Sequence, residues 1–234
     1  MTHQISVPAP GDLLDSDLFR DVSERGLADA IRCARVRQLP KGVTIFTQDQ
    51  PADRAHSLLA GRVRIAQGDA DGGRLLVRFV GPGETFGTLG LFTGHRYPAD
   101  AATVTDSAEM SWTEAALLGL IARYPQIAVN LVKIAGERLR DAENRLRELA
   151  TQRVERRIAH AILRLTEKAG PATDNGTAIG FPLSRKDLAE MCGTTLHTVS
   201  RILTAWEREG WIETHQQRIA IRNPAVLRKM ADEP

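Results

Sequence analysis

Residues 183–212 read LSRKDLAEMCGTTLHTVSRILTAWEREGWI, and this stretch decides the fold of the C-terminal part of the chain. Apolar residues recur at helical spacing in two short runs, which predicts two helices. Between the runs lies Cys192-Gly193-Thr194, where Gly193 can adopt a positive φ without a Cβ clash. Ser184 and Asp187 have the spacing of a capping box at the start of the first helix. The stretch therefore predicts a helix-turn-helix.

The second predicted helix has one apolar face and one polar face, and Thr194 or Thr195 can cap its N-terminus. The residues predicted to pack inward are Leu196, Val199, Ile202, Leu203 and Trp206. The residues predicted to point outward are Thr195, His197, Thr198, Ser200, Arg201 and Thr204. Hydroxyls, an imidazole and a guanidinium near a helix N-terminus suit a DNA major groove. The same pattern also fits a surface helix of a small α-bundle.

A predicted β-hairpin follows the two helices. Residues 211–214 and 218–222 alternate apolar and polar side chains around residues 215–217, as hairpin strands do. Helix, turn, helix and hairpin in this order predict a winged helix-turn-helix, which favours nucleic-acid binding.

Composition limits the remaining classes of protein. Hydrophobic residues make up 42% of the 234 residues and charged residues 26%, which is typical of a globular protein. Net charge is only +2, although residues 151–234 hold 13 basic and 10 acidic residues, or +3. The two cysteines, Cys33 and Cys192, support neither a disulfide framework nor a zinc site. No signal peptide or apolar run of about 18 residues is found, so we expect no membrane contact and a cytoplasmic protein.

The N-terminal half has a different texture. Residues 11–36 read as short amphipathic helices, whereas residues 35–112 contain short alternating runs separated by glycine-containing turns. Many short strands at this spacing predict an antiparallel roll, barrel or sandwich.

A heptad pattern begins after Pro125. The apolar positions of this seam are Ala128, Val132, Ala135, Leu139, Ala142, Leu146 and Leu149. Their 4,3 spacing predicts a long helix that pairs with a second copy through Val132, Ala135, Leu139, Ala142, Leu146 and Leu149. The alternative is an amphipathic helix that lies on its own β-domain. Arg153 interrupts the seam, and a second apolar stripe begins at Val154, which indicates a hinge.

The sequence therefore predicts an α+β fold in three parts. They are a β-roll domain over residues 1–125, a dimerisation helix over 126–153 and a winged helix-turn-helix domain over 154–234. The roll is expected to sense a small effector.

Four motifs support a resemblance to a known family. They are GPGETFG at 81–87, LGLF at 89–92, VERRIA at 154–159 and TVSRIL at 198–203. With the predicted order of roll, long helix and winged helix, the chain resembles the CRP/FNR family of bacterial transcription regulators over about residues 20–225. The resemblance implies a homodimer on palindromic double-stranded DNA, RNA polymerase as a further partner, and an effector bound between roll and dimer helix.

The chain departs from the cyclic-AMP-binding members of that family. Thr88 stands where they carry a ribose-binding acid, and Tyr97 and Pro98 stand near the place of their phosphate-binding Arg-Ser pair. Ala142-Glu143 replaces a Thr-Ser pair that receives adenine, while Arg96 is an alternative phosphate partner across a one-residue gap. The effector pocket implied by the resemblance comprises Thr88, Leu89, Arg96, Tyr97, Pro98, Leu139 and Ala142. Because a buried phosphate without a guanidinium costs several kcal/mol, we expect an effector other than cyclic AMP.

Two segments are similar to the nitric-oxide-responsive, denitrification-linked branch of the family. They are Tyr97-Pro98-Ala99 and residues 196–201. Haem is a candidate cofactor by this resemblance, with His56 and His95 as candidate ligands, although each also reads as an ordinary strand or surface histidine.

The polar face of the second predicted helix suggests which side chains contact DNA. Arg201 is expected to bind O6 and N7 of guanine, with a phosphate contact as the alternative. Ser200 can bind a base edge or pack near a thymine methyl. His197 stands where many relatives carry a glutamate that binds cytosine, so a different base preference is expected there. Phosphate contacts are expected from Thr195, Thr198, Arg185, Lys186, Gln217 and Arg218.

A second class of function shares the same roll. In that alternative the roll is the ligand-binding regulatory module of an enzyme or channel, and a catalytic or membrane segment is expected after it. This chain instead continues into the predicted winged helix. No nucleophile–base or metal constellation is found, so an enzyme is not expected.

Overall fold

The computed structural model describes residues 13, 15–169, 172–173, 176–215 and 217–232. They form two compact units. The first combines residues up to Ala70 with Arg78–Arg140, and the second combines Asp71–Val77 with the residues from Asp141 onward.

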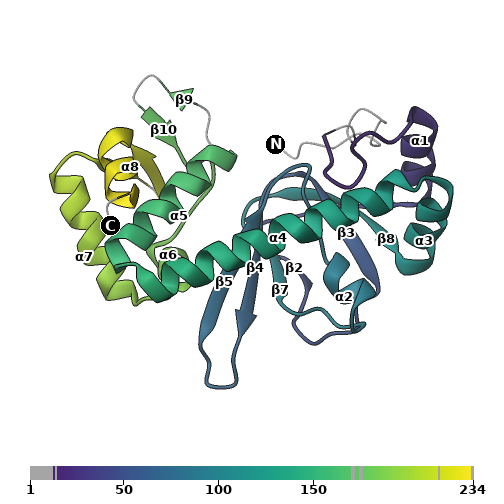
Figure 1. The fold of residues 1–234 in the computed structure, drawn as a ribbon, viewed down its shortest axis with the longest axis horizontal. Helices are drawn as coiled ribbons and strands as arrows, with labels where there is room; N and C mark the ends of the chain where they lie inside the picture. The colour runs from purple at the N-terminus through teal and green to yellow at the C-terminus, as the bar shows by residue number, and fades with distance from the viewer. Residues whose placement is uncertain (1–12, 14, 170–171, 174–175, 216, 233–234) are drawn as a thin grey trace. The chain divides into compact units, whose positions relative to one another are not determined.

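Two four-stranded sheets build the roll (Figure 1). The first has the order β1 (Arg35–Leu39), β8 (Ser107–Thr113), β3 (Arg54–Ala60), β6 (Thr85–Phe86). The second has the order β2 (Thr44–Phe46), β7 (Asp100–Thr103), β4 (Val63–Gly68), β5 (Arg74–Val80). Strand β8 pairs antiparallel with both β1 and β3, and β7 does so with β2 and β4. The predicted antiparallel roll is confirmed.

Alternation along the strands separates two cores. One lies between the sheets and contains Phe46, Leu58, Val63, Val80, Phe86, Tyr97 and Ala101. The other lies against the helices, where Met110 and Trp112 of β8 pack with residues of α1 (Glu24–Cys33), α3 (Glu114–Arg123) and the start of α4. Helix α2 (Thr88–Phe92) joins the second core through Leu91. Strands β1 and β6 and helices α2 and α3 were not predicted.

Helix α4 runs over 26 residues, Gln126–Thr151, as the heptad seam predicts (Figure 1). Ile127, Asn130 and Ile134 are buried on one side of it. The buried Asn130 amide donates to the carbonyls of Leu18 and Arg20, which fastens the N-terminal segment to this helix. Helix α4 ends at Thr151, and α5 (Val154–Ala169) begins directly after Arg153. The predicted break in the helix at Arg153 is therefore confirmed.

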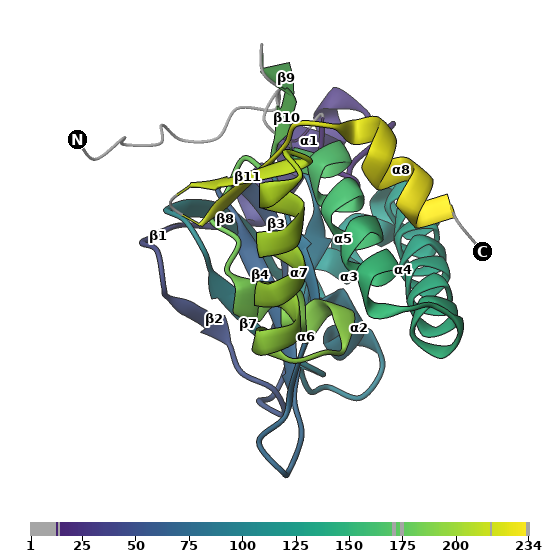
Figure 2. The ribbon, with the colours of Figure 1, turned by 90° about the vertical axis from the view of Figure 1, so that its left-hand side faces the viewer.

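The second unit contains the predicted helix-turn-helix, α6 (Arg185–Cys192) and α7 (Leu196–Arg208), and the hairpin β11 (Ile212–His215) and β12 (Arg218–Ile221). Two further strands, β9 (Ala172–Thr173) and β10 (Gly176–Ala178), extend the sheet to the order β11-β12-β10-β9. Helix α8 (Pro224–Asp232) lies along α5 (Figure 2), where the Arg156 Nε donates to the Ala231 carbonyl over 2.6 Å. Strands β9 and β10 and helix α8 were not predicted from the sequence.

Candidate nucleic-acid interface and effector region

Local side-chain chemistry fixes both ends of α6. The Ser184 hydroxyl accepts from the Asp187 backbone N–H while the Asp187 carboxylate accepts from the Ser184 N–H, so the predicted capping box is present. Gly193 follows the helix with φ +58°, the left-handed conformation that the turn requires. Thr195, and not Thr194, then caps α7 by accepting from the Thr198 N–H. These contacts fix both ends of α6 and the start of α7, the predicted recognition helix.

The two faces of α7 follow the predicted division with one exception. Val199, Ile202, Leu203 and Trp206 are buried, whereas His197 and Arg201 are exposed. Ser200 and Thr198 are half-buried on the polar side. Leu196 was predicted to be buried, but it is 47% exposed. It is the first residue of the helix, before the turn that packs on the core, which explains the wrong prediction.

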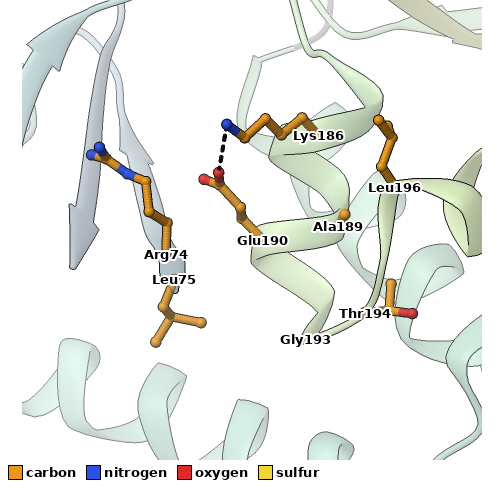
Figure 3. A pocket seen from close by; sticks show the side chains of 8 residues that line it. All are labelled: Arg74, Leu75, Lys186, Ala189, Glu190, Gly193, Thr194 and Leu196. Carbon is orange, nitrogen blue, oxygen red and sulfur yellow. Dashed lines mark ion pairs between the residues drawn. The ribbon is translucent and has the colours of Figure 1, made fainter. Parts of the chain in front are cut away.

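Leu196 instead borders an open pocket of about 550 Å³ within the second unit (Figure 3). The other residues that line it are Arg74, Leu75, Lys186, Ala189, Glu190, Gly193 and Thr194. In Figure 3 the Lys186 ammonium group lies beside the Glu190 carboxylate, with 3.8 Å between their charged atoms. An exposed lysine with so distant a partner remains available to a phosphate.

The other predicted phosphate contacts have different surroundings. Arg185 pairs with Glu207 of α7 at 3.6 Å, an interaction that links the two helices of the motif. Arg218 is exposed at the start of β12, next to Gln217, whose φ of +62° turns the hairpin. Gln216 lies outside the described residues. All of these side chains belong to the second unit, together with Arg201.

Tyr97, a predicted effector-pocket residue, lies inside the roll and is 1% exposed. Its ring stacks on that of Phe46, and its hydroxyl donates to the Arg54 carbonyl at 2.8 Å. Burial, with a smaller contribution from Asp53, raises the pKa of this phenol to about 12. The side chain is therefore a neutral part of the core at physiological pH.

A buried charged network lies beside Tyr97, and two of its members, Glu109 and Arg37, were not predicted as site residues. The fully buried Glu109 carboxylate binds the Arg37 Nε at 2.7 Å and the His56 Nδ1 at 3.0 Å. The His56 Nε2 is 3.5 Å from the Tyr97 hydroxyl. Burial alone would raise the pKa of the Glu109 carboxyl, but His56 and Arg37 outweigh it and lower this pKa.

The remaining predicted pocket residues are not gathered in the interior. Thr88 is half-buried, whereas Leu89 and Pro98 are exposed. Arg96 is also exposed, and its guanidinium donates to the Asp49 carbonyl at the surface. Leu139 and Ala142 are exposed on α4.

The seam of α4 is an exposed apolar stripe. Val132, Leu139 and Leu146 are 72%, 61% and 68% exposed, and Ala135 and Ala142 between them are exposed as well. Leu149 is less exposed because its side chain lies against Gly193, where a Cβ would come within 2.8 Å of the Leu149 Cδ2.

The part of the chain that the structure describes has neither a single membrane-spanning helix nor a metal-binding cluster. No single helix there has both the length and the apolar character for crossing a membrane, and only the bent pair α3–α4 passes this test jointly. No group of three histidine, cysteine or acidic side chains within these residues is arranged to hold a metal ion.

Comparison with known proteins agrees with this geometry. Residues 36–124 match the cyclic nucleotide-binding domain family, and residues 156–230 match the Crp-like helix-turn-helix domain family. The chain is 26% identical over 219 residues to the CRP-like cAMP-activated global transcriptional regulator of Mycobacterium tuberculosis, covering 94% of this chain and 98% of that protein. It is 30% identical to the transcriptional regulator SdrP of Thermus thermophilus, covering 78% and 86% respectively. The solved structure of FixK2 from Bradyrhizobium japonicum matches with a TM-score of 0.76 and 25% identity, covering 86% of this chain and 98% of that one.

Proposed function

Because this chain belongs to the CRP/FNR family of transcription regulators, we propose that it is a homodimeric, sequence-specific DNA-binding regulator whose roll responds to an effector other than cyclic AMP. The observation that carries the DNA-binding part is α7. This helix is capped at Thr195 and packed through Val199 and Leu203, and it presents Arg201 to solvent. RNA polymerase is the expected further partner, and the protein is expected to act in the cytoplasm.

Dimer formation is supported by the exposed stripe on α4. Large apolar side chains exposed at heptad spacing are unfavourable in water, and pairing with a second α4 would bury them. Most of the exposed positions beside the stripe carry charged side chains, such as Lys133, Glu137 and Arg140, although Val129 is 47% exposed outside it. Two recognition helices on a two-fold axis would then read a palindrome whose halves lie about one helical turn apart.

The roll interior does not fit cyclic AMP bound in the manner of its receptors. Tyr97 fills the interior with a neutral phenol, and Arg96, the alternative phosphate partner, is exposed. The guanidinium of Arg37 is committed to Glu109, and that of Arg54 donates to the Ser111 hydroxyl at 2.9 Å. A cyclic phosphate placed there would lose its hydration, and neither of these two guanidiniums could compensate it without giving up its present partner.

Haem does not fit the two candidate histidines either. Both ring nitrogens of His56 face partners, the Glu109 carboxylate and the Tyr97 hydroxyl, and the residue is 3% exposed. His95 lies at the surface with a positive φ. The likeness to the nitric-oxide-responsive branch rests on sequence alone, and an absorption spectrum with added haem and nitric oxide tests it.

Fluorescence anisotropy tests the main proposal. A palindrome obtained by binding-site selection should bind far more tightly than a scrambled duplex, and the affinity should fall steeply with salt. Calorimetry with cyclic AMP should give no heat of binding. Equal affinity for palindrome and scrambled duplex would contradict sequence-specific regulation, and micromolar cyclic AMP binding that disappears in Arg96→Ala would contradict the effector assignment.

A further inference from the structure

A single guanidinium joins two helix ends in the second unit. The Nε of Arg157 donates to the Cys192 carbonyl at 3.0 Å, its NH1 to the Gln152 carbonyl at 2.9 Å, and its NH2 to the Gly193 carbonyl at 3.3 Å. Gln152 directly follows α4, whereas Cys192 ends α6 and Gly193 is its C-cap. Arg157 itself lies in the first turn of α5.

These contacts can hold two helices together because the carbonyls at a helix C-terminus lack hydrogen-bond partners. The last carbonyls of a helix have no partner within it, and they carry the negative end of the helix dipole. A guanidinium offers several donors in a rigid planar fork and keeps its charge at every relevant pH. Arg157 can therefore stabilise the ends of α4 and α6 together, which two neutral donors on separate side chains would do less firmly.

Two further contacts connect α5 to the ends of α4 and α6. The Cys192 thiol donates back to the Arg157 carbonyl at 3.7 Å, and Arg164 of α5 pairs with the buried Glu148 near the end of α4. The Leu149 side chain fills the space beside Gly193, where no side chain would fit. The turn between α6 and α7 is thus packed against the last turn of α4.

We propose that Arg157 is a positioning residue that fixes the recognition helix relative to the C-terminal end of α4, and thereby sets the half-site spacing the dimer accepts. This rests on the proposed dimeric DNA binding. Arg157 does not need to touch DNA for this role. If two α4 helices pair, the orientation of each α7 relative to its own α4 determines the distance and the rotation between the two α7 helices of the dimer.

The test uses operators with identical half-sites and different central spacers. One added or removed base pair shifts the halves by about 3.4 Å and rotates them by about 34°. Wild-type protein should strongly prefer one spacer length. In Arg157→Ala, the ratio of affinity for the best spacer to that for its neighbours should fall by roughly tenfold, because three charge-assisted hydrogen bonds are lost. The base preference within each half-site should remain as in wild type.

Arg156→Ala is the matched control. Arg156 caps the end of α8 through Ala231, so its loss removes an adjacent arginine and one helix cap while the three hydrogen bonds of Arg157 remain. We expect lower thermal stability but an unchanged spacer ratio. A second variant, Arg157→Gln, keeps volume and one donor while losing the charge and the fork, and it carries the test if Arg157→Ala does not fold.

The outcomes distinguish the positioning role of Arg157 from the dimeric operator binding on which it rests. A folded Arg157→Ala or Arg157→Gln protein with the wild-type spacer ratio, even at lower overall affinity, would overturn the positioning role and leave a merely structural one. A wild-type protein with no spacer preference would overturn dimeric operator binding, and the role of Arg157 with it. A relaxed ratio in the Arg157 variants together with a normal ratio in Arg156→Ala supports the proposal.

Discussion

The rings of Tyr97 and Phe46 lie parallel inside the roll, with their centroids 3.7 Å apart and their planes 8° apart. Tyr97 reaches this place from the segment before β7, and Phe46 reaches it from β2. The stack occupies the interior between the two sheets, so Tyr97, which was predicted to line an effector pocket, contributes to the core.

The first prediction concerns the stability of the roll. Tyr97→Ala should lower the free energy of unfolding by about 3–5 kcal/mol, because it removes a buried aromatic side chain. Tyr97→Phe keeps the ring and loses the hydrogen bonds of the hydroxyl, chiefly those with the Arg54 backbone, which should cost about 1–2 kcal/mol. Urea denaturation followed by tryptophan fluorescence measures both values. Similar stabilities for the two variants would show that the stack contributes little.

The second prediction concerns pH. The pKa of Glu109 is lowered in the folded protein, so its contribution to stability is present above the ordinary carboxyl pKa and is lost as pH falls through the folded-state pKa. Glu109→Gln should cost about 3–5 kcal/mol at pH 7, since it leaves Arg37 and His56 without their buried anion. The difference between wild type and variant should shrink below about pH 4. A difference that stays constant from pH 7 to pH 3 would contradict an ionised Glu109.

The winged helix-turn-helix was predicted well because its signals are local. Ser184 and Asp187 are three positions apart, and the inward residues of α7 repeat within one or two turns. The Leu196 error arose at a helix end, where periodicity cannot tell which side the neighbouring chain covers. The Glu109 network could not be predicted in this way, because Glu109 meets His56 and Arg37 across 53 and 72 positions. Only strand pairing brings them together, and the sequence does not reveal the register of β1, β3 and β8.

The third prediction concerns the dimer. Leu139→Glu combined with Leu146→Glu should place like charges on a paired apolar seam and yield monomers in sedimentation velocity. Leu118 of α3, 48% exposed and outside the seam, provides the control, and Leu118→Glu should remain dimeric. A double variant that still sediments as a dimer would show that the seam of α4 is not the interface.

The fourth prediction distinguishes the two thiols. Burial raises the pKa of Cys192 to about 12, so its thiol stays protonated and unreactive at pH 7–8, whereas Cys33 is exposed. A chromogenic disulfide reagent should therefore titrate one thiol rapidly in native protein and both in denaturant. Cys33→Ser should abolish the rapid phase. Rapid labelling of Cys192 in that variant would mean that the joint between α5 and α6 opens readily.

The last prediction concerns base recognition. Arg201 is exposed on α7, one position beyond the half-buried Ser200 and four beyond the exposed His197. A guanidinium there can bind guanine O6 and N7 in the major groove, so Arg201→Ala should cost about 1–3 kcal/mol per half-site and relax the preference at one base position.

Two further variants, at Lys186 of α6 and at His197 of α7, separate base reading from phosphate binding. Lys186→Ala should weaken all sequences alike and reduce the salt slope by about one unit, because a lysine on a phosphate carries no sequence information. His197→Glu should shift preference toward cytosine, since a carboxylate accepts from cytosine N4. Binding-site selection on the three variants measures the base preferences, and anisotropy titrations at several salt concentrations measure the salt slope. If Arg201→Ala selects the same sequence as wild type, Arg201 contacts a phosphate, and base reading must come from other residues of α7.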